Sequence, residues 1–286
     1  MRLALGTAQF GLPYGISNKL GKVSQSEISS MLRVASKAGI DLLDTAISYG
    51  ESESCLGAAD VSNFRIITKL PSLPIDCGDI SNWVNKHVNA SLTRLCVKNL
   101  DTLLLHNSEN LLSNNGGLLY QELQQLKINN KVEKIGISIY SPRELDAIYE
   151  KFNVDLIQTP FNLIDQRIYL SGWLDELKAK NVEVHARSIF LQGLLLMKRD
   201  AIPSRFCAWN FLWDKWNAWL DNNKASAVKA CLDFVQSFNQ FDRIIVGVDT
   251  TIQLNDLIKI FNSEKLVDFP KITSSDEDLI NPSRWF

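Results

Sequence analysis

The chain has 286 residues, 45% of them hydrophobic, and is long enough to bury the core of one barrel or of two smaller domains. Its 30 basic and 32 acidic side chains give a formal net charge of −2 without a basic stripe, which argues against nucleic acid as a partner. No stretch approaches the roughly 18 apolar residues of a membrane span, and no signal-peptide pattern follows Met1, so we expect no membrane partner and a cytoplasmic location.

Eight short apolar runs alternate with helical patterns along the chain. Strands that are buried on both faces have this continuous apolar character. The candidate strands are Leu3–Gly6, Asp41–Asp44, Arg65–Lys69, Leu100–His106, Lys134–Ser138, Asp155–Thr159, Glu183–Arg187 and Arg243–Gly247. Eight βα units in about 260 residues are typical of a (β/α)8 barrel. We therefore predict an α/β fold, a single TIM barrel domain that spans residues 1–286.

Helix signals fill the gaps between these strands. Ser24 and Glu27 have the spacing of a capping box, and Gly39 stands where a glycine commonly follows a helix. The run 141–144, Ser-Pro-Arg-Glu, repeats the device with proline at the first helical position. The other predicted helices are Asn82–Leu95, Leu118–Asn129, Gly172–Ala179, Ala225–Phe238 and Ile252–Phe261.

Two connections are longer than usual for such a barrel. The Asn- and Gly-rich stretch Ser108–Gly117 is predicted to be a loop. Met197–Lys224 forms an extended insertion after the seventh strand, and one face of its expected helix carries Trp209, Leu212, Trp213, Trp216 and Leu220. This face indicates either a helix packed on the barrel or a lid over a substrate, and both can hold because loops after strands form the rim of the site.

Four polar residues follow the first strands in an order that suggests chemistry. Asp44, Lys69 and His106 end strands, and Tyr49 lies in the loop after Asp44. A tyrosine with an ordinary pKa of about 10 is a poor acid, but a nearby lysine lowers that pKa, and an aspartate holds the lysine charged. A histidine opposite can hydrogen-bond a carbonyl oxygen as negative charge develops there. None of the four can donate a hydride, so the reducing equivalent would come from a cofactor.

These four residues and the segments around them resemble the aldo-keto reductase family. The resemblance runs from residue 3 to about residue 257 and rests on Gly6-Thr7-Ala8-Gln9-Phe10-Gly11, Leu43-Asp44-Thr45-Ala46, Tyr49-Gly50 with Glu53, Leu56-Gly57, Lys69, and Leu104-Leu105-His106-Asn107. It implies a (β/α)8 barrel that reduces an aldehyde or ketone, with sugars among the candidates, using NADP or NAD. Tyr49 would be the general acid and His106 would polarise the carbonyl, while Lys69 and Asp44 tune Tyr49.

The resemblance also implies a cofactor site. Ser138 matches the serine that binds the nicotinamide carboxamide, and Gln158 matches a glutamine beside it. Arg187 stands where the family usually has an aromatic that stacks on the nicotinamide, a role that a guanidinium plane can also fill. The complete set of expected cofactor residues is Thr7, Ala8, Asp44, Ser138, Gln158, Arg187, Ser188, Phe190, Gln192, Gly193, Gly247, Asp249 and Gln253.

Two features depart from the family pattern. Many members open with a hairpin that plugs the bottom of the barrel, and we expect that hairpin to be absent because the first strand follows Met1 so closely. After the eighth strand, where members often have a base for the 2′-phosphate of NADP, this chain has Asp249, which suits a ribose hydroxyl instead. Arg167 or Lys259 could still reach a phosphate, so the cofactor remains NADP or NAD.

Two other kinds of function are compatible with these residues. The barrel could be a nicotinamide-binding sensor or partner subunit with little turnover, which an assay with aldehydes and sugars would reveal. It could also be a Schiff-base aldolase that uses Lys69, which borohydride trapping would detect. Three histidines without H-x-H spacing and five cysteines without a C-x-x-C pair predict no metal site. The substrate, expected to be a small carbonyl compound, would contact Phe10, Tyr14, the Ser108–Gly117 loop, the insertion and the tail Trp285-Phe286; no oligomeric state is indicated.

Overall fold

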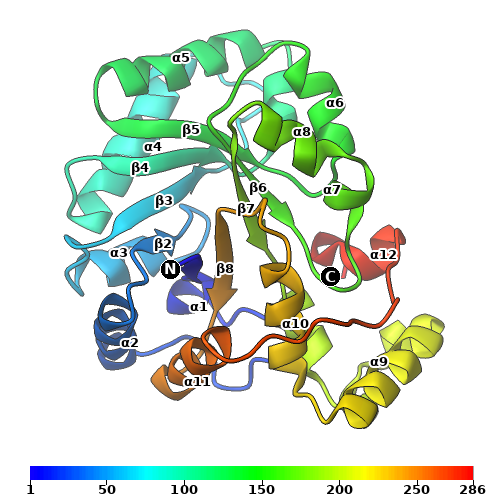
Figure 1. Ribbon diagram of the computed structural model, residues 1–286. Coiled ribbons are helices and arrows are strands. Elements are labelled where there is room, and N and C mark those ends of the chain that lie inside the picture. Colours follow the sequence, from blue (N-terminus) through cyan, green and yellow to red (C-terminus); the bar gives the residue numbers. More distant parts are fainter. Residues whose placement is uncertain (286) are drawn as a thin grey trace.

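Eight parallel strands close into a barrel in the computed structural model, which describes residues 1–285 (Figure 1). Consecutive strands are neighbours, and β8 pairs with β1 to complete the ring. The strands are β1 (Leu3–Gly6), β2 (Leu42–Asp44), β3 (Arg65–Leu70), β4 (Leu100–Leu105), β5 (Val132–Ser138), β6 (Leu156–Pro160), β7 (Glu183–Arg187) and β8 (Arg243–Gly247). The structure confirms the predicted (β/α)8 barrel.

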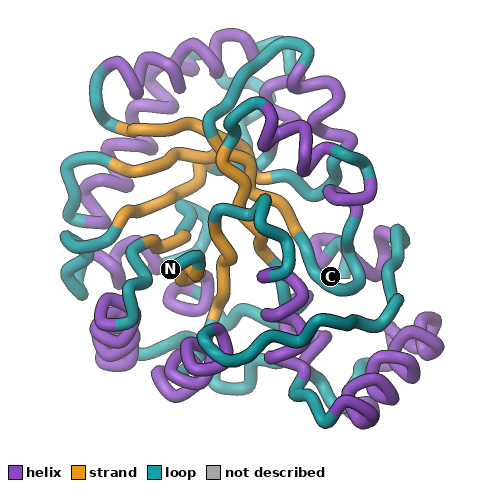
Figure 2. The backbone as a smooth tube through the Cα atoms, in the orientation of Figure 1, coloured by secondary structure: helices purple, strands orange, loops and turns teal. Residues whose placement is uncertain are grey.

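Helices surround the strands on the outside of the barrel (Figure 2). The α-helices are α1 (Ala8–Gly11), α2 (Gln25–Lys37), α3 (Ser52–Gly57), α4 (Ile80–Leu95), α5 (Gly116–Ile128), α6 (Arg143–Tyr149), α7 (Arg167–Leu170), α8 (Trp173–Ala179), α9 (Asn210–Asn223), α10 (Ala227–Gln236), α11 (Thr251–Phe261) and α12 (Glu277–Ile280). The 3-10 helices are η1 (Ser108–Leu112), η2 (Leu191–Leu196), η3 (Arg199–Ala201), η4 (Ser204–Trp209) and η5 (Pro282–Arg284). Within residues 1–285, no helix has both the length and the apolar character needed to cross a membrane.

The predicted helix caps are present, with one difference. Ser24 accepts a hydrogen bond from the backbone N–H of Glu27 at 3.3 Å, and Gly39 has a φ of +77° after α2. The Glu27 carboxylate does not close a reciprocal box, because it accepts the backbone N–H of Thr251 at the start of α11. This contact joins two helices that are far apart in the sequence but adjacent around the barrel.

The stretch Ser108–Gly117 is more regular than predicted. It contains η1, and α5 already begins at Gly116. The Asn107 side chain caps η1 by accepting the N–H of Glu109 at 3.1 Å. Leu119 and Leu123 bury one face of α5, so tertiary packing overrides the turn preference of the glycines and asparagines.

Side chains of alternate strand residues form two separate apolar layers. The cluster inside the barrel consists of Ala4, Leu42, Ile67, Leu104, Leu156 and Ile245. On β4, the flanking Leu103 and Leu105 belong instead to the larger core between strands and helices. Because side chains on a strand repeat with a period of two, the residue two positions after each inner residue points to the same side, one layer nearer the C-terminal end of the barrel. Those residues are Gly6, Asp44, Lys69, His106, Gln158 and Gly247.

The N-terminal ends of the strands carry paired charges. Lys134 Nζ lies 2.5 Å from Glu183, and Arg65 Nε lies 2.7 Å from Asp101. Arg243 is 3.1 Å from the carboxylate of Asp41. These pairs link β3 to β4, β5 to β7, and β8 to the start of β2, so ion pairs tie strands together at the end of the barrel opposite the predicted site.

The long insertion folds as an amphipathic helix packed on the body of the protein. Trp213 and Trp216 of α9 are fully buried, and their indole N–H groups donate to the carbonyls of Phe206 and Leu195, both at 3.0 Å. The predicted helical face is therefore the buried one. The segment before α9 reaches the mouth of the barrel, as described below.

Gly136 provides a test of packing inside the barrel. A Cβ atom there would lie 2.2 Å from the carbonyl oxygen of Leu156 and 2.7 Å from Leu104 Cδ2. We expect Gly136→Ala to lower the free energy of unfolding by about 1–3 kcal/mol, the usual cost of overpacking. Gly117→Ala is the matched control, because this exposed helical position has nothing within 4 Å, and it should stabilise by about 0.5–1 kcal/mol. Urea unfolding of both variants measures the difference, and equal midpoints would contradict the assigned packing.

Candidate functional site

The C-terminal ends of the strands open into a cavity of about 1130 Å³. All the predicted site residues except Lys69 line it, and Lys69 lies buried beneath its floor. The lining residues predicted from the sequence are Thr7, Ala8, Asp44, Tyr49, His106, Ser138, Gln158, Arg187, Ser188, Phe190, Gln192, Gly193, Gly247, Asp249 and Gln253. The fold thus brings together residues from seven strands and the loops that follow them.

Lys69 and Asp44 form an ion pair in the floor of the cavity. The Lys69 ammonium lies 2.8 Å from each Asp44 oxygen and 2.8 Å from the carbonyl of Thr45, so all three of its N–H donors have acceptors. Gln158 Nε2 donates to the same carboxylate at 2.7 Å. Burial lowers the pKa of Lys69, and the Asp44 charge opposes that shift. The pair therefore carries little net charge toward its surroundings.

Tyr49 lies directly above this pair. Lys69 Nζ is 5.0 Å from the centre of the Tyr49 ring. Burial raises the pKa of the Tyr49 hydroxyl far above its ordinary value, Asp44 raises it further, and Arg187 acts in the opposite direction. We expected Lys69 to lower this pKa; in the structure the bidentate contact with Asp44 offsets the lysine charge, and the balance is upward. The phenol is therefore fully protonated at neutral pH.

His106 faces Tyr49 across the cavity and is also neutral. The two rings meet edge to face, with centroids 5.7 Å apart. Burial lowers the pKa of His106 to about 4, and the positive charges of Lys69 and Arg187 contribute to the shift. His106 Nδ1 lies 2.9 Å from the Ser48 hydroxyl. When Ser48 donates to Nδ1, the imidazole proton resides on Nε2, which becomes the hydrogen-bond donor of the ring.

Ser48 was not among the residues predicted from the sequence. It is one of many serines and stands one position before Tyr49 without a motif of its own. Only the approach of β4 to the loop after β2 reveals its contact with His106.

Replacement of Ser48 tests the tautomer of His106. In the parent, the neutral ring should carry its proton mainly on Nε2, whereas Ser48→Ala removes the donor to Nδ1 and should raise the population of the Nδ1–H form. Nitrogen chemical shifts of His106, recorded at about pH 7, distinguish the two forms. Ser48→Thr keeps the hydroxyl and serves as the control. Identical spectra for the parent and Ser48→Ala would contradict this assignment.

The next part of the cavity has groups suited to an amide and a phosphate-containing ligand. Gln158 Oε1 is buried and has no hydrogen-bond partner among the described residues, and Ser138 stands beside it at the end of the adjacent strand. In the loop after β7, Ser188 and Gln192 adopt φ values of +56° and +52°. Gly193, with a φ of +91°, sits so close to Ser17 that a Cβ would fall 2.0 Å from its hydroxyl oxygen. The contact at Gly193 packs the loop after β7 against the loop after β1, and the dinucleotide site stays a prediction.

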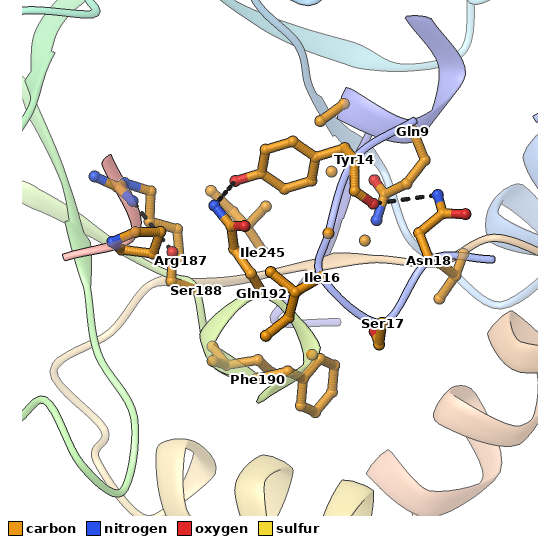
Figure 3. A pocket seen from close by; sticks show the side chains of 18 of the residues that line it. Gln9, Tyr14, Ile16, Ser17, Asn18, Arg187, Ser188, Phe190, Gln192 and Ile245 are labelled. Carbon is orange, nitrogen blue, oxygen red and sulfur yellow. Dashed lines mark hydrogen bonds between the residues drawn. The ribbon is translucent and has the colours of Figure 1, made fainter. Parts of the chain in front are cut away.

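The loop after β1 crosses the cavity and meets the loop after β7. Ile16 N donates to the carbonyl of Gln192 at 3.2 Å, and Gln192 Nε2 lies 3.2 Å from the Tyr14 hydroxyl (Figure 3). Figure 3 shows Gln192 between Tyr14 and Phe190, with Ile16 beside it. The two loops thus form a bridge over the elongated cavity.

The far end of the cavity is acidic. Asp249 accepts a long hydrogen bond of 3.4 Å from Asn18, and its backbone N–H donates to Gln253 Oε1 at 2.7 Å. Burial raises the pKa of Asp249. Neither of the bases considered for a phosphate lines the cavity. Arg167 pairs with Asp165 at 2.8 Å, and Lys259 lies 3.4 Å from Asp256.

The residues expected to contact a substrate are only partly those that line the cavity. Tyr14 lines it, as do Arg205 and Phe206 of the insertion. Phe10 does not, because it is fully buried in the core, and no residue of Ser108–Gly117 reaches the lining. From the C-terminal tail, Pro282 and Ser283 take part, whereas Trp285 does not, because its buried indole donates to the carbonyl of Asp278 at 3.1 Å; Phe286 lies outside the described residues. Among residues 1–285, no cluster of three or more histidine, cysteine or acidic side chains is arranged to hold a metal.

Comparison with known proteins identifies relatives of this chain. The model of the aldo/keto reductase family matches residues 2–273. The chain is 39% identical over 108 residues to the oxidoreductase sirO of Leptosphaeria maculans, a match that covers 36% of this chain and 32% of that protein. It is 29% identical over 181 residues to YqkF, an uncharacterized oxidoreductase of Bacillus subtilis, covering 59% and 58%. These matches thus span about a third and somewhat over half of the relatives' lengths.

Solved structures share the fold at low sequence identity. The holo form of an aldo-keto reductase from Bacillus halodurans has a TM-score of 0.75 at 17% identity, with 93% of this chain and 88% of the other covered. A glycerol dehydrogenase from Gluconobacter oxydans has a TM-score of 0.71 at 24% identity, with the same coverage. At such identities the likeness concerns the fold.

Proposed function

This chain belongs to the aldo/keto reductase family, whose members are NAD(P)-dependent oxidoreductases, and from that premise we propose that it reduces an aldehyde or ketone to the alcohol. Sugars are among the candidate substrates. The observation that carries the proposal is the meeting of two neutral hydrogen-bond donors, Tyr49 and His106, in a cavity above the buried Lys69–Asp44 pair. This set of groups suits a carbonyl oxygen that gains negative charge during the reaction.

Tyr49 and His106 have different parts in this proposal. His106, neutral at pH 7, donates a hydrogen bond from Nε2 and polarises the carbonyl. Tyr49 remains protonated, so its hydroxyl can transfer a proton to the oxygen as charge develops. Lys69, held by Asp44 and Thr45, fixes the floor beneath the phenol, and Arg187 is the cation that favours the phenolate that remains. Ser48 sets the ring of His106 in the donor orientation and acts as a positioning residue.

The expected cofactor residues support a nicotinamide dinucleotide, NAD or NADP. Such a cofactor supplies a hydride to the carbonyl carbon when it is bound. Ser138 and the unpartnered Gln158 oxygen would hold its carboxamide. The loop after β7, with Ser188 and Gly193, would hold the pyrophosphate, and Asp249 with Gln253 would face the adenosine ribose.

Tyr49→Phe tests the proton donor. This substitution keeps the ring and removes only the hydroxyl, so cofactor binding should survive while the kcat for aldehyde reduction falls by about 10² or more, as for other lost general acids. Quenching of protein fluorescence by the reduced cofactor measures binding, and absorbance of the cofactor measures turnover. A Tyr49→Phe variant as fast as the parent would show that another group donates the proton.

Two other functions remain as alternatives with distinct tests. A nicotinamide-binding sensor or partner subunit would bind the cofactor but turn over none of a panel of aldehydes and sugars. A Schiff-base aldolase would need Lys69 as a free amine, yet the three donors of Lys69 are engaged and the side chain is fully buried. Borohydride in the presence of a carbonyl compound should therefore leave Lys69 unmodified.

The negative charge of Asp249 predicts which cofactor the protein prefers. We propose that NAD(H) is used at least comparably with NADP(H), because a carboxylate beside the ribose repels a 2′-phosphate and accepts a hydroxyl. Asp249→Arg should shift the ratio of dissociation constants toward NADPH by about tenfold, the scale of one charge-assisted pair. Asp256→Asn, which removes a neighbouring charge, serves as the comparison. A parent that binds NADPH a hundredfold more tightly, with a ratio that Asp249→Arg leaves unchanged, would show that Asp249 does not face the ribose.

A further inference from the structure

Arg187 brings to the cavity a positive charge that forms no ion pair with a carboxylate of residues 1–285. Its guanidinium lies 4.5 Å from the centre of the Tyr140 ring, donates to the carbonyl of Ile139 at 2.9 Å and to the Ser188 hydroxyl at 3.1 Å, and keeps Nε without a partner. Its described hydrogen-bond acceptors are both uncharged. Of the five N–H donors of a guanidinium, these contacts engage two. Of the remaining three, Nε–H is shielded from solvent, and one N–H on each terminal nitrogen has no acceptor among residues 1–285.

The catalytic end of the cavity therefore has an excess of one positive charge. Lys69 and Asp44 cancel each other, and Tyr49 and His106 are neutral at pH 7. The positive charge of Arg187 is the one that none of these groups offsets. Its charge reaches the reacting groups, since it lowers the pKa of both Tyr49 and His106. Arg205 adds a second guanidinium to the lining, from the insertion.

The opposite end of the cavity carries negative charge. Asp249 and Asp256, both in the lining, lie beyond β8. An anionic group of a ligand would thus be repelled at the ribose end and attracted at the end that holds Tyr49. A fixed cation in a partly buried site strengthens a charge-assisted hydrogen bond, and the planar fork of arginine matches the two oxygens of a carboxylate.

We propose that the preferred carbonyl substrate carries a carboxylate, which Arg187 attracts and orients. This inference rests on the proposed reductase function and names the substrate class of the same site. A carboxylate carries one negative charge, equal and opposite to that of Arg187, whereas a phosphate carries about −1.5 to −2. Arg187 would hold the anionic end while the carbonyl of the same molecule lies between Tyr49 and His106.

A matched pair of aldehydes tests the proposal in the full-length protein with saturating reduced cofactor. The anion 4-oxobutanoate and its neutral methyl ester share the same chain and carbonyl. We expect kcat/KM for the anion to exceed that for the ester by about tenfold or more at low salt. The ratio should contract as ionic strength rises from about 0.01 M to about 1 M, where the screening length falls to about 3 Å. Glyceraldehyde 3-phosphate against glyceraldehyde tests the phosphate, and a larger preference for that phosphate would overturn the carboxylate assignment.

Three variants assign the preference to its residue. Arg187→Gln should reduce the ratio of anion to ester about tenfold, and Arg187→Lys should retain most of it because the charge remains. Arg33→Gln, on the exposed face of α2, changes the net charge equally but far from the cavity and should leave the ratio unchanged. A ratio that falls as much in Arg33→Gln as in Arg187→Gln would overturn the role of Arg187.

A binding measurement separates this inference from the proposed function. By calorimetry, 4-hydroxybutanoate should bind the parent, loaded with oxidised cofactor, at least about tenfold more tightly than butan-1-ol. Equal affinities, together with equal reduction of the two aldehydes, would overturn the carboxylate preference and leave the reductase function standing. Absence of reduction for every aldehyde would instead overturn the proposed function and the substrate class with it.

Discussion

The contact between Lys69 and Asp44 is the constraint on which the candidate site depends. Two opposite charges are buried on the inner face of adjacent strands, with both carboxylate oxygens 2.8 Å from the ammonium. Removal of either partner would leave a buried charge alone, at a cost of about 3–5 kcal/mol. The pair also organises its neighbours, because Gln158 is held by the same carboxylate and Tyr49 lies over the ammonium. A fully satisfied polar network in the barrel floor holds these groups rigid.

The charge states of the site follow from that pairing. Because Asp44 offsets Lys69, burial dominates at Tyr49 and His106, and both stay neutral at pH 7. Two neutral donors can hydrogen-bond a ground-state carbonyl without introducing a further buried charge, and they gain strength as the oxygen becomes negative. The charge that is not offset belongs to Arg187, which has no ion-pair partner among residues 1–285. This charge changes the electrostatics of the cavity while the rest of the floor keeps its neutral balance.

Loops form the walls and the rim of the cavity above the barrel floor. The loop after β1 meets the loop after β7 through Ile16, Tyr14 and Gln192, and both loops line the cavity. The insertion before α9 and the C-terminal tail reach the same rim. Residues at or just after the strand ends therefore form the floor of the cavity, and segments with no common periodicity define the shape around it.

The sequence by itself determined the barrel and the floor of the site. Apolar runs separated by helix signals predict eight strands, and a two-residue period sends Asp44, Lys69 and His106 to the same inner face as the apolar residue two positions before each of them. The tertiary structure alone decided the contacts between loops and the sign of each pKa shift. The loop Ser108–Gly117 was expected at the rim but packs as helix away from the cavity, and Phe10 was expected in the pocket but lies in the core. Ser48 has no motif, and its contact with His106 depends on the distance between two loops. Periodicity is a local property that a strand retains in any fold, whereas burial and the pairing of charges depend on which segments the closed barrel brings together.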